Sequence, residues 1–219
     1  MTMSSALRQA AGVEFTFPAE PKIGLARIER TRWTDIPAQE SELWAELVHG
    51  DRSPIQFGTV SPLVGAMTAQ EVGFGCTRFD LRGCQNALST LNMIRLGAAR
   101  QHFDVVIIYE VGVRSKKENT GIAFADLTIL GGAILPTRRL KAAGVAKALV
   151  MDVRNGYPYA TASAFADLSA FSASWGSDAR RHALHGDAAK AVVEKLAPDV
   201  GAALAQLLVY AKGKADAAG

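Results

Sequence analysis

The chain has 219 residues, a mass of 23.2 kDa and a formal net charge of +3 at neutral pH. With 49% hydrophobic and 21% charged residues, the composition excludes a wholly disordered chain. No apolar run approaches the ~20 residues of a membrane-spanning helix. The balance of 24 basic to 21 acidic side chains is far from that of a dedicated nucleic-acid-binding protein. These figures predict one soluble globular domain.

The N-terminus and the cysteines bear on the cellular compartment. The segment MTMSSALRQAAG lacks the apolar core of a signal peptide, so either the protein is cytoplasmic or a leader is missing from this sequence. Cys76 and Cys84 are the only cysteines. They could close a small disulfide loop in an oxidising compartment, or they could remain reduced thiols.

The first half of the chain contains alternating and helical hydrophobic patterns. Alternation predicts a strand over 22–29, and Asp35 before a proline predicts the start of a helix. The segment 51–83 is rich in Gly and Pro and indicates only a short strand at 55–60. Apolar residues at helical spacing predict a helix over 86–102.

The middle of the chain is dominated by strands. The β-branched run FDVVIIYEVGV predicts a central strand covered on both faces. The charged segment 114–121 is typical of a turn, and a further strand is expected over 124–136. Asn155-Gly156 predicts a hairpin with a type I′ turn, in which both central residues have positive φ.

The C-terminal third has a helical pattern over 177–212, which Gly186 and Pro198 are expected to divide into segments. Of 38 alanines, 19 follow position 150, and such small side chains favour close packing of a helix on a sheet. The whole pattern predicts an α+β fold: a mixed, mostly antiparallel sheet, covered by helices on one face, with a long C-terminal helix.

The expected domain organisation follows from these elements. Residues 1–21 are expected to form a flexible tail, residues 22–212 a single α+β domain, and residues 213–219 a second tail.

Candidate catalytic and metal-binding side chains are sparse. His182 and His185 have the spacing of two ligands on one helix face, with Asp187 nearby, but no third ligand is indicated and we interpret the segment as a solvated helix face. Glu110 and Asp126 could form an acid/base pair if their strands pair, or could each lie at a strand end or in solvent. We therefore predict no catalytic, cofactor-binding or metal-binding residue and no cofactor.

Basic side chains gather in two segments that we interpret as turns. They are Arg114, Lys116 and Lys117 in the first segment and Arg138, Arg139 and Lys141 in the second. Such clusters usually keep loops solvated, but they could contact an anionic partner such as membrane headgroups or nucleic acid. No aromatic ladder accompanies them, which makes a single-stranded nucleic acid a poor fit.

The segment 86–162 resembles the bacterial envelope proteins called rhombotarget lipoproteins and, more distantly, the TolB N-terminal domain and the curli-secretion lipoprotein. The shared pattern is a helix, a strand and a strand pair that ends in a turn. The matching residues are Leu91, Arg95, Asp104, Val105, Thr128, Ile129, Gly131 or Gly132, Ala133, Pro136, Ala148, Asp152 and Val153. The chain departs from the family in lacking a lipobox cysteine, over residues 51–83 and in the loop at 114–121.

The resemblance implies an exported protein that a lipid on its N-terminus tethers to the membrane. It brings no active-site residues. We expect a non-enzymatic periplasmic domain that binds another envelope protein or itself. Alternatives are a cytoplasmic protein, a hydrolase that uses His182 or His185 with Glu110, and a nucleic-acid-binding module that uses the two basic segments.

Overall fold

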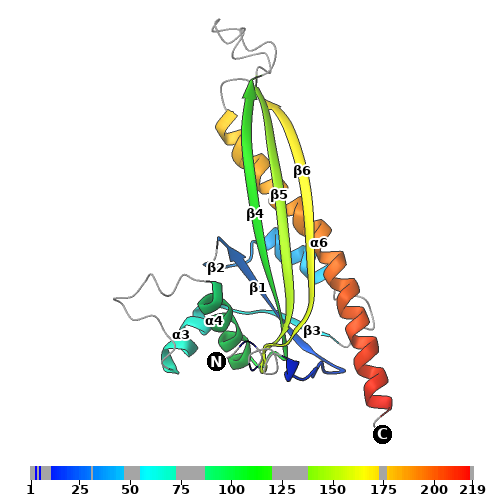
Figure 1. Cartoon of the computed structure of the whole chain (residues 1–219). Helices are drawn as coiled ribbons and strands as arrows, with labels where there is room; N and C mark the ends of the chain where they lie inside the picture. The colour runs from blue at the N-terminus through cyan, green and yellow to red at the C-terminus, as the bar shows by residue number, and fades with distance from the viewer. Residues whose placement is uncertain are drawn as a thin grey trace, which may run out of the picture. The chain divides into compact units, whose positions relative to one another are not determined.

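The chain is shown in Figure 1 as a computed structural model. The structure describes residues 3, 5, 11–30, 32–46, 55–72, 87–119, 138–172 and 177–217. The strands are β1 (Lys22–Glu29), β2 (Arg32–Thr34), β3 (Gln56–Thr59), β4 (Val105–Asn119), β5 (Arg138–Asp152) and β6 (Pro158–Ser172). The helices are α2 (Ala38–Glu46), α3 (Pro62–Glu71), α4 (Ala87–Arg100) and α6 (Ser177–Asp216). The predicted strand at 124–136, Asp126, Cys76 and Cys84 lie outside the described residues.

The strands form one mixed, mostly antiparallel sheet in the order β2-β1-β4-β5-β6, with β3 also paired to β1. β1 runs parallel to β4 along one edge. Along its other edge, the first half of β1 is parallel to β3 and the second half is antiparallel to β2. The predicted α+β class and the long C-terminal helix are confirmed.

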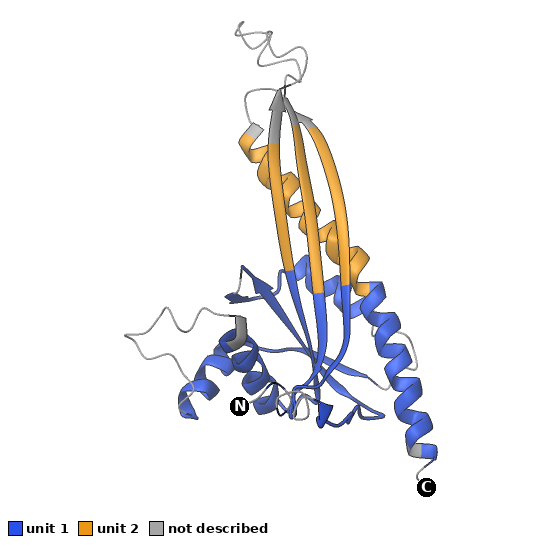
Figure 2. Cartoon of the chain, in the orientation of Figure 1, with its two compact units in different colours: residues 1–110, 148–162, 198–219 blue, residues 111–147, 163–197 orange. Residues whose placement is uncertain are grey.

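The chain forms two compact units, which Figure 2 shows in different colours. Unit 1 comprises residues 1–110, 148–162 and 198–219, and unit 2 comprises residues 111–147 and 163–197. The divisions fall inside β4, β5, β6 and α6, so the same elements supply both units. Each unit has a hydrophobic cluster of its own. Within the described residues, no helix has the length and hydropathy needed to cross a membrane.

In unit 1 the sheet is buried on both faces. The cluster on one face joins β1, β4 and the end of β5 to α4, and its buried members are Ala26, Ile28, Val60, Ile94, Ala98, Val106, Ile108, Met151 and Val153. On the other face, Trp44 of α2 contacts Tyr109 of β4, with ring centroids 5.0 Å apart. Because successive strand residues point to opposite faces, α2 and α4 contact opposite sides of the sheet. The doubly covered strand is confirmed, and helices lie on both faces here, where we expected them on one.

In unit 2, α6 packs on one face of β4, β5 and β6. The cluster contains Leu140, Ala142, Leu184 and Ala188, with Val113, Leu168 and Ala170 packed against it. A Cβ atom added at Gly144 would lie 2.8 Å from the carbonyl oxygen of Ala188, so strand and helix approach closely where both carry small residues. This is the close packing that the alanine content predicts.

Two local predictions are wrong: the turn over 114–121 and the division of the C-terminal helix. The charged residues of segment 114–119 extend β4 instead of forming a turn, since charged side chains are tolerated on a strand face that is open to water. Gly186 and Pro198 lie inside the single helix α6. Proline in a helix costs about 3 kcal/mol, but Leu196 and Val200 on either side of Pro198 are buried and offset that cost.

The predicted hairpin joins β5 to β6, but its turn is not type I′. Gly156 has a φ of +76°, whereas Asn155 is not among the described residues with positive φ. The Asp152 carboxylate accepts hydrogen bonds from the backbone N–H groups of Arg154 and Asn155, and these bonds set the turn instead.

The helix α3 was not predicted, and it packs closely on α4. Its glycine, Gly65, lies against the Trp33 ring, and a Cβ atom added at Gly97 of α4 would lie 2.9 Å from the Cα atom of Gly65. Gly65 lowers the helix propensity of residues 62–71, so the sequence did not predict α3. The same glycine is what permits the two helices to approach.

A buried ion pair ties α2 to the sheet. Arg27 Nε donates to Glu40 Oε2 at 3.0 Å, and the Tyr109 hydroxyl donates to the same oxygen at 2.8 Å. Burial opposes the charge on Arg27, yet the hydrogen bond to Glu29 and the attraction of Glu40 raise its pKa above the ordinary value. Burial and the neighbouring Glu40 raise the pKa of Tyr109. Arg27 therefore stays charged and the Tyr109 hydroxyl stays protonated at neutral pH.

We expect Glu40→Gln to lower the free energy of unfolding by up to about 3–5 kcal/mol, because it removes the buried counter-ion of Arg27 and leaves only the more exposed Glu29. Glu29→Gln is the matched control, since Glu29 also pairs with Arg27 but is 47% exposed, and it should cost less than about 1 kcal/mol. Urea unfolding measures the free energy of unfolding of both variants. Equal decreases would contradict the larger contribution of the buried Arg27–Glu40 pair.

Gly65→Ala should destabilise the protein by about 1–3 kcal/mol, because the methyl group would collide with the Trp33 ring. Gly186→Ala in α6 should have the opposite sign and stabilise by about 0.5–1 kcal/mol, since nothing lies within 4 Å of the added Cβ atom. Thermal and urea unfolding test this pair, and destabilisation of equal size at both positions would contradict the packing described for α3 and α4.

Candidate functional site

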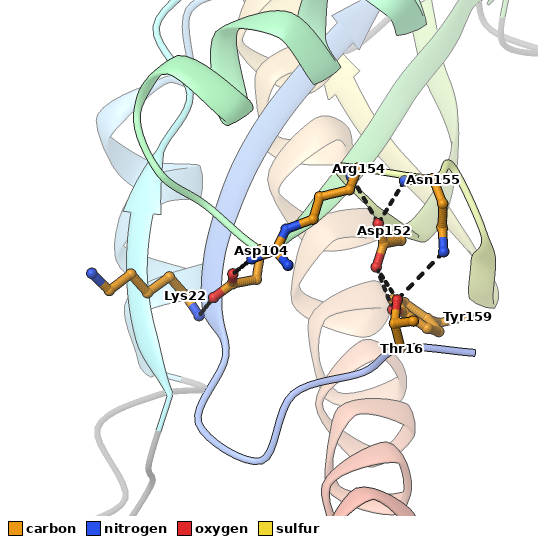
Figure 3. A network of polar contacts seen from close by, with 7 residues as sticks. All are labelled: Thr16, Lys22, Asp104, Asp152, Arg154, Asn155 and Tyr159. Atoms are coloured by element: carbon orange, nitrogen blue, oxygen red, sulfur yellow. Dashed lines mark hydrogen bonds and ion pairs between the residues drawn. The ribbon is translucent and has the colours of Figure 1, made fainter. Parts of the chain in front are cut away.

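The densest polar network in the described part of unit 1 surrounds the turn between β5 and β6 (Figure 3). Asp152 is 3% exposed, and its carboxylate accepts four hydrogen bonds. The donors are Thr16 Oγ1 at 2.9 Å, the Tyr159 hydroxyl at 2.7 Å, and the N–H groups of Arg154 and Asn155 at 2.7 and 2.9 Å. The network joins the N-terminal segment to the turn.

A second carboxylate extends this network. Asp104 accepts from the backbone N–H of Lys22 at 3.1 Å and from Arg154 Nη2 at 3.2 Å (Figure 3). Arg95 of α4 donates to the carbonyl oxygens of Val153 and Arg154 at 3.2 and 2.9 Å. Both carboxylates and the Arg95 guanidinium are therefore committed to holding backbone segments together.

The Asp152 carboxylate is a poor acid or base for catalysis. Burial alone would raise its pKa, but the hydrogen bonds from Asn155, Tyr159, Thr16 and Arg154 lower it below the ordinary value. All four acceptor positions of the carboxylate are occupied, so a substrate proton has no free oxygen to approach. This network positions the turn and the N-terminal segment.

Aromatic rings fix the same segment. Phe15 contacts Tyr157, Tyr159 and Tyr210, with centroid distances of 5.9, 5.2 and 4.9 Å, in edge-to-face geometry. Phe17 is buried and lies 4.9 Å from Tyr159. Such pairs contribute about 0.5–1.5 kcal/mol each beyond their buried area.

The described residues of the predicted catalytic alternatives lie on α6 and β4. His182 is exposed and His185 half-buried on α6, and Glu110 is exposed on β4. Asp187, the third residue of the metal hypothesis, is exposed on α6. Among the described residues, no group of three or more His, Cys, Asp or Glu side chains could hold a metal ion.

A different feature of unit 2 is its sheet face opposite α6. In β5 the even-numbered residues Leu140 and Ala142 pack toward α6, so Lys141 and Val145 point away from it. The same alternation places Val113 of β4 toward the helix and Arg114 away from it. We call the outward side of these strands the open face. Its described members are Gly112, Arg114 and Lys116 of β4, Lys141, Ala143, Val145 and Lys147 of β5, and Ser163, Phe165, Asp167 and Ser169 of β6.

The open face is exposed to solvent and carries two large apolar side chains. All of its members are exposed except Ala143, which is half-buried. Val145 is 41% and Phe165 54% exposed. A Cβ atom added at Gly112 would lie 4.0 Å from the Val145 carbonyl oxygen, so the glycine of β4 lies beside Val145 and leaves it uncovered.

The predicted basic residues belong to strands and not to turns. Arg114 and Lys116 lie on the open face, as does Lys141. Lys117, Arg138 and Arg139 fall within β4 and β5, but their side chains lie outside the described part of the structure. Lys147, Val145 and Phe165 were missed. The alternation in KAAGVAK, with small residues between Lys141, Val145 and Lys147, is the signal that could have found them.

Comparisons with known proteins give remote similarities only. No protein-family model matches the chain, and no curated protein matches it in sequence. Among solved structures, the LpoB C-terminal domain from Salmonella enterica is similar with a TM-score of 0.35 and 15% identity, over 74% of this chain and 90% of that chain. A minor lipoprotein from Acinetobacter baumannii gives a TM-score of 0.38 at 7% identity, over 87% and 92% of the two chains.

A third solved structure, the lipoprotein GNA1162 from Neisseria meningitidis, gives a TM-score of 0.34 at 14% identity, over 69% of this chain and 84% of that chain. Similarity at this level supports no conclusion about function. The resemblance of segment 86–162 to rhombotarget lipoproteins, the TolB N-terminal domain and the curli-secretion lipoprotein is not tested by these similarities and stays a prediction.

Asp152→Asn should lower the free energy of unfolding by about 1.5–3 kcal/mol at neutral pH, because hydrogen bonds to a charged acceptor are weakened. The folded-state pKa of Asp152 is lowered, so its contribution is fully present above the unfolded-state pKa of about 3.9 and is lost as the pH falls through the folded-state value. The difference between wild type and variant should therefore shrink in acid.

Urea unfolding at a series of pH values measures this difference, with Asp199→Asn as a control because Asp199 is exposed on α6. A loss that is constant with pH, or equal in the control, would contradict the role given to the carboxylate.

Proposed function

We propose that this chain is a non-enzymatic binding domain of the bacterial cell envelope, and that its open face holds another protein. The open face is the observation that carries the proposal. In unit 2 a single helix covers one side of three long strands, and the other side remains exposed in the described residues with Val145 and Phe165 upon it. Solvent-exposed aromatic and aliphatic side chains surrounded by polar ones are typical of protein interaction sites.

The strand backbone and the residue types of the open face favour binding over catalysis. Its side chains stand on strands, whose backbone is fixed by sheet hydrogen bonds, so the surface is rigid before a partner arrives. The only carboxylate among its described members is Asp167, and histidine and cysteine are absent from them. We also propose that the domain lies in the periplasm and is tethered to the membrane by a lipid, and this part of the proposal rests on the resemblance of segment 86–162 to envelope lipoproteins.

Photo-crosslinking tests this function. A benzophenone amino acid is placed at Phe165 in the full chain, produced in its own host, and a second chain carries it at Arg180, an exposed residue of α6 in the same unit. We expect one discrete protein adduct from position 165, recovered in the envelope fraction, and none from position 180. The captured protein, once purified, should bind Phe165→Ser about tenfold more weakly than wild type, because a buried aromatic contact is lost.

Phe165→Ser should leave the thermal unfolding midpoint within a few degrees of wild type, since the side chain is 54% exposed. Equal adducts at both positions, or no protein adduct at position 165, would contradict the proposed function.

A further inference from the structure

The open face carries a strong excess of positive charge. Among its described members, Arg114, Lys116, Lys141 and Lys147 are basic and Asp167 alone is acidic. The four basic residues are all exposed. The whole chain has a net charge of only +3, so this one face of unit 2 carries an excess as large as that of the complete sequence.

The basic residues border the apolar ones. Along β5, Val145 is two residues from Lys147 and four from Lys141, on the same side of the strand. On β4, Arg114 lies two residues beyond Gly112, which itself lies beside Val145. The face therefore carries Val145 with basic side chains close to it along β5, and Phe165 on the neighbouring strand β6.

This arrangement favours one kind of occupant over the others. A second copy that bound face to face would place basic side chains against basic ones, and this repulsion disfavours self-association. Phe165 is the single aromatic residue among the described members of the face, and a nucleic-acid strand needs several stacking positions. A lipid surface binds through buried apolar area as well as charge, and the two large apolar side chains Val145 and Phe165 offer it little such area.

We propose that the partner is an acidic protein segment that places apolar side chains on Val145 and Phe165 and carboxylates beside Arg114 and Lys147. This inference rests on the proposed function and adds to it the chemistry of the partner. Charge of this kind at an interface margin raises the association rate and selects among partners more than it adds affinity. Binding should therefore weaken as salt shortens the Debye length from ~10 Å at 0.1 M to ~3 Å at 1 M.

The test uses the purified full chain and three probes of known composition. They are a short peptide in which Glu alternates with Leu, a vesicle of phosphatidylglycerol in phosphatidylcholine, and a short DNA duplex. Binding of each is measured by fluorescence anisotropy or sedimentation for wild type, for the double variant Arg114→Glu with Lys147→Glu, and for a matched control, Arg180→Glu with Lys212→Glu. The control changes the net charge by the same amount at two exposed positions of α6.

We expect the acidic peptide to bind wild type and the control equally, and to bind the double variant at least about tenfold more weakly at low salt. Replacing Glu by Gln in the peptide should weaken its binding to wild type by a similar factor of at least about ten at low salt. Equal loss in the control, no binding of the acidic peptide to wild type, or preferential binding of vesicles or duplex would overturn the inference.

The same double variant, carrying benzophenone at position 165, separates this inference from the proposed function. A protein adduct that survives charge reversal leaves the function intact and overturns the acidic partner. Loss of the adduct in the double variant alone, with the control unchanged, supports both.

Discussion

The structure depends on the alternation of strand side chains between the two faces of the sheet. Helices cover both faces of the sheet in unit 1 and one face in unit 2, so the alternation decides which side chains are exposed. β4 displays the constraint within one strand. Residues 105–109 are all buried, since α4 lies on one side of them and α2 on the other. Over residues 110–114 exposed side chains alternate with less exposed ones, because α6 is the only helix packed on the described strands of unit 2. An apolar sequence run is needed where both faces are covered, and alternation suffices where one is. The open face is a direct consequence.

The polar groups inside unit 1 serve the same architecture. The Arg27–Glu40–Tyr109 contact fastens α2 to the sheet face away from α4, and the Asp152 network fastens the N-terminal segment to the β5–β6 turn. In both, carboxylate oxygens accept hydrogen bonds from neighbouring donors, so Glu40 and Asp152 stabilise the fold. Binding chemistry is consequently a matter of surface side chains, and the open face has the distinctive combination of apolar and basic ones.

The sequence predicts the elements whose pattern is local, and it fails where contacts between distant segments decide the structure. Strong periodicity located β1, α4 and the first half of β4, and Asn155-Gly156 located the hairpin. Composition misled where tertiary contacts decide. The charged residues 114–119 have the composition of a turn, but they form a strand because α6 leaves one face of β4 exposed to water. The helix α3 was missed because Gly65 lowers helix propensity, and its contacts with Gly97 and Trp33 cannot be read from the sequence. Arg114 and Lys116 were singled out correctly as surface cations, but Val145, Lys147 and Phe165 join them only once the strands are side by side.

The central claim is that the open face is occupied by a protein in the cell. Hydroxyl-radical footprinting of the full chain, purified and within its producing cells, measures this directly, since it reports side-chain exposure residue by residue. Phe165 and Val145 should be protected in cells relative to the purified chain, whereas the exposed Leu63, Val209 and Tyr210 of unit 1 should react equally in both. Unchanged reactivity at Phe165 and Val145, with protection at the unit 1 residues, would contradict the claim.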